Sequence, residues 1–174
     1  GLIVQIGEWI LWEACRFLAR QHARGLLVTV SVNLSARQFT DQDLPGLVER
    51  ILKRTGALPE YLILEITESM LMGDTDAAIT QLNELKRLGL ALSIDDFGTG
   101  YSSLSYLKRF PVDELKIDRS FVKDIPDDKN DMDITAAIIA MAQKMDLRVV
   151  AEGVETAEQV EFLLNNTCYL VQGY

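Results

Sequence analysis

The sequence predicts an α/β fold of the TIM-like (β/α) barrel type. Segments with strand and helix periodicity alternate through six units of the 174-residue chain, a pattern typical of a parallel sheet with crossover helices. Polar side chains follow the end of each expected strand, which is where a barrel collects its catalytic groups. A doubly wound open sheet is the alternative, but it usually carries a glycine motif after its first strand. The segment Val32-Asn33-Leu34-Ser35 has no glycine, which favours the barrel.

The first half of the chain is expected to begin with a helix and then to alternate. Apolar residues recur at helical spacing in three segments that each stop before a glycine, namely 7–24, 44–55 and 74–88. Asp74 or Thr75 is expected to cap the third helix. Runs of branched and aliphatic residues predict strands at 26–32, 61–66 and 90–94. Asp95 and Asp96 are therefore expected directly after the third strand.

The second half continues the alternation. Strands are expected at 112–117, 147–151 and 169–171, with helices at 131–145 and 156–164. A short helical turn should follow Asp118 and run through Val122. Thr156 and Gln159 match a capping box, which predicts the start of the last helix.

Composition narrows the classes of function. A net charge of −9 disfavours binding to a nucleic-acid polymer. No apolar run is long enough to span a membrane, and two cysteines are too few for a disulfide framework, so a cytoplasmic location is the expectation, although a longer parent protein could be membrane-anchored. The chain lacks an initiator methionine and a basic leader, so we expect it to be cut from a longer protein.

The polar residues at the strand ends suit a metal site. They are mainly carboxylates, without histidine or cysteine: Asn33, Glu65, Asp95, Asp96, Lys116, Asp118, Glu152 and Gln172. Oxygen ligands favour Mg²⁺ or Mn²⁺ over Zn²⁺ or Cu²⁺. Two such ions would neutralise the acids and support displacement at a phosphate. Lys116 would then hold the attacking water and offset charge on the phosphate.

These residues also fit three other interpretations. Glu65 or Glu152 could instead form a buried structural ion pair with Lys116. The tripeptide Asp96-Phe97-Gly98 also occurs in protein kinases, but the kinase catalytic-loop motif is absent from this sequence. A glycosidase would use a carboxylate pair, but it needs neither the lysine nor the adjacent acids.

Six segments of the chain closely resemble the motifs of EAL domains, the bacterial phosphodiesterases that open cyclic di-GMP to linear pGpG on a modified TIM barrel. The segments are Asn33-Leu34-Ser35 with Gln38, Leu64-Glu65-Ile66-Thr67-Glu68, Asp95-Asp96-Phe97-Gly98-Thr99-Gly100-Tyr101-Ser102-Ser103-Leu104, Leu115-Lys116-Ile117-Asp118, Ala151-Glu152-Gly153-Val154-Glu155 and Gln172-Gly173-Tyr174. The resemblance covers the whole chain in order.

The resemblance implies a role for each residue. The metal pair would be held by Asn33, Glu65, Asp95, Asp96 and Glu152, with Asp95 as the bridge. Lys116 and Asp118 would act with Glu152 in catalysis by positioning the attacking water, while Glu155 and Gln172 would serve the substrate. Glu68 would anchor the loop from Phe97 to Ser102, including Gly98, Thr99 and Gly100, which the family uses to link dimerisation to metal occupancy.

The same resemblance sets expectations about the parent protein. Residues 1–174 are expected to be a partial EAL domain, because the first strand with the Glu-Ala-Leu signature and the last strand are absent, and six strands cannot close an eight-stranded barrel. The expected partners are cyclic di-GMP, a second copy of the domain and an upstream sensor or regulatory domain. The function is expected to be hydrolysis of cyclic di-GMP. The alternative is a catalytically inactive cyclic di-GMP receptor or regulatory module.

Overall fold

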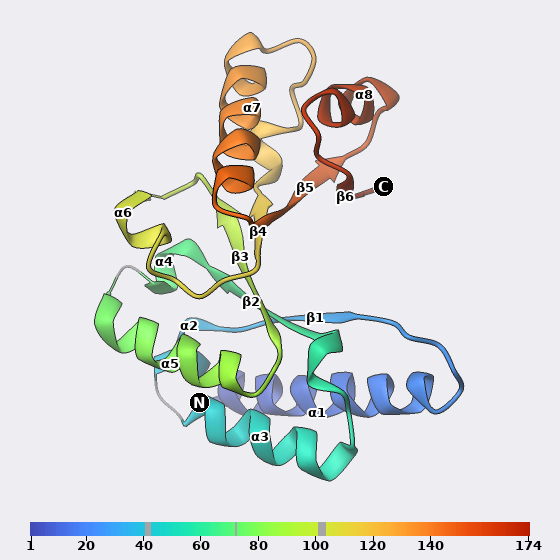
Figure 1. The fold of residues 1–174 in the computed structure, drawn as a ribbon, viewed down its shortest axis with the longest axis vertical. Coiled ribbons are helices and arrows are strands. Elements are labelled where there is room, and N and C mark those ends of the chain that lie inside the picture. Colours follow the sequence, from blue (N-terminus) through green and yellow to red (C-terminus); the bar gives the residue numbers. More distant parts are fainter. Residues whose placement is uncertain (41–42, 72, 101–103) are drawn as a thin grey trace. The chain divides into compact units, whose positions relative to one another are not determined.

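The computed structural model describes residues 1–40, 43–71, 73–100 and 104–174 (Figure 1). Its strands form one six-stranded sheet in the order β1-β2-β3-β4-β5-β6. The pairs β1–β2, β4–β5 and β5–β6 are parallel, and helices connect successive strands. The predicted α/β class with a parallel sheet is therefore confirmed. The chain divides into two compact units, Gly1–Ser93 and Ile94–Tyr174.

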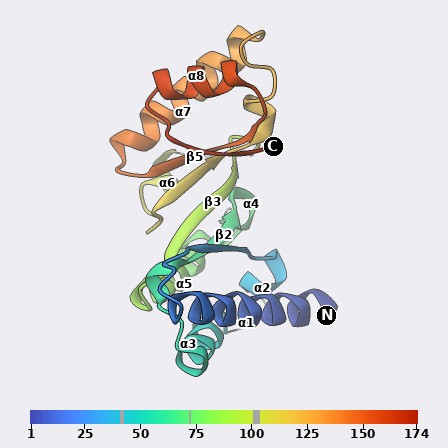
Figure 2. The same ribbon diagram turned by 90° about the vertical axis from the view of Figure 1, so that its right-hand side faces the viewer.

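The first unit contains all the described helices that precede β3. Its elements are α1 (Leu2–His22), β1 (Val30–Asn33), α2 (Ala36–Thr40), α3 (Leu44–Thr55), the 3₁₀ turn η1 (Pro59–Tyr61), β2 (Leu62–Thr67), α4 (Glu68–Leu71), α5 (Thr75–Arg87) and the beginning of β3 (Ala91–Phe97). α1 packs against both β1 and α3 and lies between them in Figure 2. The buried face of α3 and β2, which is buried from Leu62 to Ile66, form the core of this unit.

Side-chain caps begin two helices of the first unit, and the one at Asp43 was not predicted. Asp43 accepts the backbone N–H of Gly46 at 3.0 Å, and Gly56 ends α3 in the left-handed conformation with a φ of 70°. Asp74 rather than Thr75 caps α5, accepting the N–H of Ala77 at 3.1 Å. Local signals therefore determine where these two helices begin and end.

The second unit carries the end of β3 and the last three strands. Its further elements are α6 (Leu104–Leu107), β4 (Glu114–Ile117), the 3₁₀ turn η2 (Arg119–Phe121), α7 (Lys129–Lys144), β5 (Arg148–Val154), α8 (Ala157–Asn165) and β6 (Leu170–Gly173). α7 packs against β4 and β5, and α8 against β5. None of the helices in the described ranges is long and apolar enough to cross a bilayer.

Several expected boundaries were wrong. The strand expected at 26–32 is limited to β1, because its pairing with β2 begins at Val30 opposite Leu62 and the preceding Leu26 and Leu27 are exposed. α1 begins five residues earlier than its apolar pattern indicated, at Leu2 instead of residue 7. The short helices α2 and α4 were missed, since four or five residues show no helical period.

The buried side chain of Gln159 ties α8 to the segment after β4. Its Oε1 accepts the N–H groups of Glu155 and Thr156 at 2.7 and 3.0 Å. Its Nε2 donates to the carbonyl oxygens of Val122 and Lys123, both at 3.2 Å. The predicted capping box is thus confirmed, and it also fixes the backbone next to β5.

Replacing Gln159 by leucine is expected to lower the free energy of unfolding by about 2–4 kcal/mol, because it leaves buried backbone donors and acceptors without partners. Chemical denaturation measures the change. The matched control is Thr156→Ser, which keeps the capping hydroxyl and should cost little. A Gln159→Leu variant as stable as the wild type would show that this network contributes nothing.

Candidate metal centre

Three carboxylates meet at the ends of β3 and β5. Asp95 and Asp96 are the fifth and sixth residues of β3, and Glu152 is the fifth residue of β5. Each offers one oxygen, and the three oxygens lie within 4.8 Å of one another. Asp95 is buried, Glu152 is half-buried and Asp96 is exposed, so the cluster runs from the interior to the surface.

The backbone of Asp96 explains how two adjacent acids reach one site. Successive side chains of a regular strand point to opposite faces, so Asp95 and Asp96 would normally be separated. Asp96 instead has a φ of 54°, in the left-handed region that aspartate tolerates better than most residues. The carbonyl of Asp96 then accepts the Thr99 hydroxyl at 2.8 Å. This local turn brings both carboxylates toward Glu152.

Lys116 on β4 is the counterion of the cluster. Its side chain is only 5% exposed, and its Nζ lies 2.6 Å from Oε1 of Glu152 and 3.2 Å from Oδ1 of Asp95. A lysine on a fully buried strand is tolerated only where carboxylates pair with it. The predicted ion pair between Glu152 and Lys116 is therefore present. The same oxygens also belong to the carboxylate cluster.

The surroundings of Asp96 disfavour the charged form of its carboxyl group. Desolvation raises the pKa of its carboxyl group above the ordinary value, and the charges of Asp95 and Asp118 raise it further, while Lys116 opposes them. One lysine is thus insufficient for the negative charge that gathers here. A divalent cation bound by these carboxylate oxygens would relieve this repulsion. The donor set therefore fits the hard cation that the sequence suggested.

Asp118 has a structural role beside its charge. Its carboxylate caps η2 by accepting the N–H of Ser120 at 2.9 Å. The turn that it starts carries Arg119, whose Nη2 lies 2.9 Å from Oε1 of Glu155. Sequence reasoning missed Arg119, because a single basic residue in a turn gives no signal of its partner across the fold. Glu155 is thus anchored near the end of β5.

Gln172 lies beside the cluster through strand pairing. It is opposite Glu152 in the register between β5 and β6. Residues opposite each other on neighbouring parallel strands lie side by side. Gln172 is exposed, like the other residues of β6.

The first unit contributes its own pair of predicted residues. Asn33 is opposite Glu65 in the register between β1 and β2. Glu65 is buried, while Asn33 is exposed. Glu68, also buried, begins α4 directly after β2. The structure therefore forms two groups, one with Asn33 and Glu65 and one with Asp95, Asp96, Lys116 and Glu152.

The loop after β3 begins from a rigid anchor. Phe97 is buried, and Gly98 has a φ of 99°. A Cβ at Gly98 would lie 2.7 Å from the ring of Phe121, so both conformation and space require glycine there. Thr99 and Gly100 follow, while Tyr101 and Ser102, the rest of the predicted coupling loop, lie outside the described residues.

A family model and curated proteins match the whole length of this chain. The family model described as EAL domain matches residues 1–174. The cyclic di-GMP phosphodiesterase NbdA of Pseudomonas aeruginosa is 51% identical over 175 residues, which cover 100% of this chain and 22% of NbdA. The chain therefore spans less than a quarter of that relative's length.

Solved structures share the fold. The MucR phosphodiesterase of Pseudomonas aeruginosa in complex with c-di-GMP superposes with a TM-score of 0.96 at 49% identity, covering 99% of this chain and 70% of that one. The Klebsiella pneumoniae protein BlrP1, in a calcium and cyclic di-GMP complex, gives a TM-score of 0.87 at 29% identity, with coverages of 98% and 43%.

Proposed function

The chain belongs to the EAL domain family, and on that premise we propose that the protein carrying it hydrolyses cyclic di-GMP to linear pGpG in bacterial second-messenger signalling. The observation that carries this proposal is the joint placement of Asp95, Asp96 and Glu152 within 4.8 Å around the buried Lys116. The similarity to NbdA and MucR, which are named for this activity, supports it. Residues 1–174 would form part of the catalytic domain.

We propose that the site holds two Mg²⁺ or Mn²⁺ ions. Their ligands would be Asn33, Glu65, Asp95, Asp96 and Glu152, with Asp95 as the shared ligand. The oxygen donors of the cluster and the raised pKa of Asp96 support a cation there. When bound, the ions would supply Lewis-acid activation of the phosphate and of the attacking water.

The chain's own residues would orient the reaction. Lys116 has a cationic Nζ already fixed by two carboxylates, and it would hold the attacking water and offset the charge that develops on the phosphate. Asp118 would orient the same water while it keeps η2 in place. Glu155 and Gln172 would contact the substrate from the end of β5 and from β6.

Separation of the nucleotides after incubation with cyclic di-GMP tests the proposal. The full protein that carries residues 1–174 should produce pGpG in the presence of Mg²⁺ or Mn²⁺. A receptor without catalytic activity is the second candidate, because the FimX EAL domain of Pseudomonas aeruginosa, 25% identical with a TM-score of 0.91, has been solved bound to c-di-GMP. Tight binding with intact cyclic di-GMP recovered after long incubation would favour the receptor.

Calcium is expected to inhibit the proposed reaction. Ca²⁺ prefers six to eight oxygen ligands at longer and more variable distances than Mg²⁺, so it would bind the carboxylates but misplace the attacking water. Titration of Ca²⁺ into a reaction that contains Mg²⁺ should therefore reduce the rate of pGpG formation. Equal rates with Ca²⁺ and Mg²⁺ as the sole cation would contradict the proposed dependence on geometry.

We also propose that the domain forms a homodimer through the surface near the Phe97–Gly100 segment, with a sensor or regulatory domain elsewhere in the protein. The support is the position of this segment directly after Asp95 and Asp96, with its start held by Phe97 and Gly98. Analytical ultracentrifugation over a concentration series should show dimers of the full protein. Full activity from a species that stays monomeric would contradict the coupling of association to the site.

A further inference from the structure

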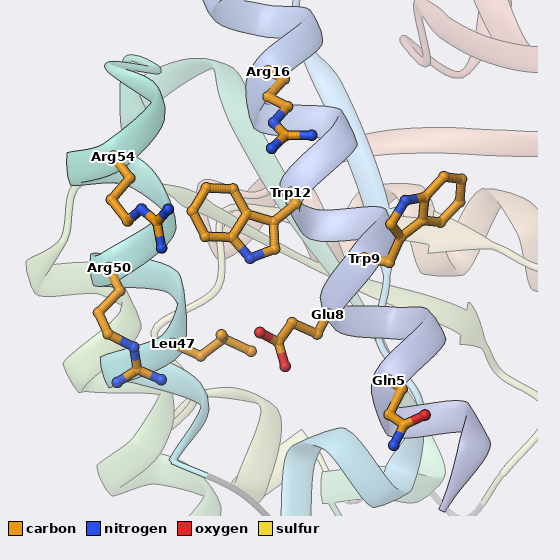
Figure 3. A pocket seen from close by; sticks show the side chains of 8 residues that line it. All are labelled: Gln5, Glu8, Trp9, Trp12, Arg16, Leu47, Arg50 and Arg54. Atoms are coloured by element: carbon orange, nitrogen blue, oxygen red, sulfur yellow. The ribbon is translucent and has the colours of Figure 1, made fainter.

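A groove runs along the surface between α1 and α3, in the first unit. Two adjoining hollows of about 450 and 330 Å³ share Trp12, Arg16 and Arg54 as lining residues. Figure 3 shows the larger hollow, with the indole of Trp12 directed toward α3 and Glu8 directed into the space between the helices. The groove lies on different elements from the carboxylate cluster, and the proposed catalytic role leaves it unexplained.

Arginines flank this groove on both sides. Arg16 and Arg20 lie four residues apart on α1, and Arg50 and Arg54 lie four apart on α3. Residues at this spacing share one face of a helix. The lining residues carry four guanidinium groups and the carboxylate of Glu8. Because Arg16 also pairs with Glu13 at 2.8 Å, the excess positive charge of the groove comes mainly from Arg20, Arg50 and Arg54, although the chain as a whole has a net charge of −9. The groove is therefore suited to an anionic partner.

Trp12 orients two of the arginines and gives the groove an apolar floor. The guanidinium carbons of Arg54 and Arg16 lie 4.9 and 5.6 Å from the centre of its ring, within the range of cation–π attraction. The buried Leu47 lines the larger hollow beside it. Trp9, next to this floor, is 63% exposed. The groove therefore offers both an apolar surface and cationic side chains to a partner.

We propose that the groove between α1 and α3 binds an acidic amphipathic helix of a protein partner. The continuous groove follows both helices, and all four arginines are exposed, whereas a small-molecule site buries most of its ligand. Glutamates one turn apart on the partner would match the arginine spacing and form charge-assisted hydrogen bonds with the guanidinium forks. Apolar residues between them would cover Trp9, Trp12 and Leu47, which is the helix-in-groove mode of recognition.

The two tryptophans of the chain make the experiment specific, because Trp9 and Trp12 are its only two and both line the groove. The probe is a helical peptide with glutamates at four-residue spacing flanking leucines. Its control has glutamine in place of each glutamate. The protein used is the full protein in its Trp9→Phe form, with any tryptophans outside residues 1–174 replaced. Binding of the glutamate peptide should then change the fluorescence of Trp12. The anisotropy of a labelled peptide gives the affinity.

Two double variants show whether the peptide binds to the groove or responds only to the net charge of the protein. Arg50→Glu with Arg54→Glu should weaken binding of the glutamate peptide by about tenfold or more, since two charge-assisted contacts become repulsive. The matched control is Arg24→Glu with Arg87→Glu, which changes the net charge equally at exposed positions outside the groove. It should leave the affinity nearly unchanged, and circular dichroism confirms that both variants fold.

Equal affinity of the two double variants, equal binding of the glutamine peptide, or no binding of the glutamate peptide below about 1 mM would overturn the proposal. Anionic vesicles and the protein itself at increasing concentration are tested as other occupants. Binding of either one that depends on Arg50 and Arg54, with no binding of the peptide, would assign the groove to that occupant instead.

Discussion

Replacing Asp95 by asparagine in the full protein is expected to reduce the turnover of cyclic di-GMP by about 10³-fold, the upper end of the loss seen when one group that stabilises charge in the transition state is removed. Asn is nearly isosteric, so the fold of β3 should survive. The change removes the negative charge that faces both Lys116 at 3.2 Å and the oxygens of Asp96 and Glu152. It therefore removes the proposed shared ligand of the cation pair.

Initial rates of pGpG formation at saturating substrate and Mg²⁺ measure this effect, together with Mn²⁺ affinity by calorimetry. The matched control is Asp133→Asn on the exposed surface of α7, which should leave both quantities unchanged. An Asp95→Asn variant with wild-type turnover would contradict the assignment of Asp95 to the metal site.

Replacing Lys116 by methionine is expected to have the second largest effect, a loss of about 10²–10⁴ in rate, as for a positioned proton-transfer or orienting group. The same substitution should not weaken metal binding. Lys116 occupies the same carboxylates of Asp95 and Glu152 that the cations would use, so its removal takes away a competing positive charge. The variant should therefore bind Mn²⁺ at least as tightly as the wild type while it turns over substrate slowly.

Stability without metal gives a second measurement on the same variant. Removing one partner of a buried ion pair leaves uncompensated charge, which costs about 3–5 kcal/mol. Lys116→Met should therefore be less stable than the wild type in EDTA, and Mn²⁺ should restore more stability to the variant than to the wild type. Wild-type turnover in this variant would refute the orienting role, and weaker Mn²⁺ binding would refute the competition.

The sequence predicted most of the fold because its helices carry strong local signals. The end of α3 at Gly56, the cap at Asp74 and the capping box of Thr156 and Gln159 are formed as expected. Strand ends were less accurate, since pairing rather than composition limits β1 to the residues opposite β2. The acids expected after β3 lie within it, because β3 extends to Phe97.

The candidate site was predicted as a set of residues but not as a geometry. Parallel strands bring their carboxyl ends to one edge, so polar residues at those ends could be grouped from the sequence. The left-handed backbone of Asp96 and the double pairing of Lys116 could not be predicted, because each depends on neighbours distant in sequence. The arginine groove was missed for the same reason, since its two pairs lie on separate helices.

The dependence on a metal pair is tested by measuring the rate of pGpG formation as a function of bound Mn²⁺ in the full protein, starting from enzyme freed of metal with EDTA. No turnover is expected without metal, and the rate should reach its maximum only when two ions are bound per site, because the oxygens of Asp95, Asp96 and Glu152 lie within 4.8 Å of one another and would bind the proposed cation pair together. Undiminished conversion of cyclic di-GMP in excess EDTA would contradict it.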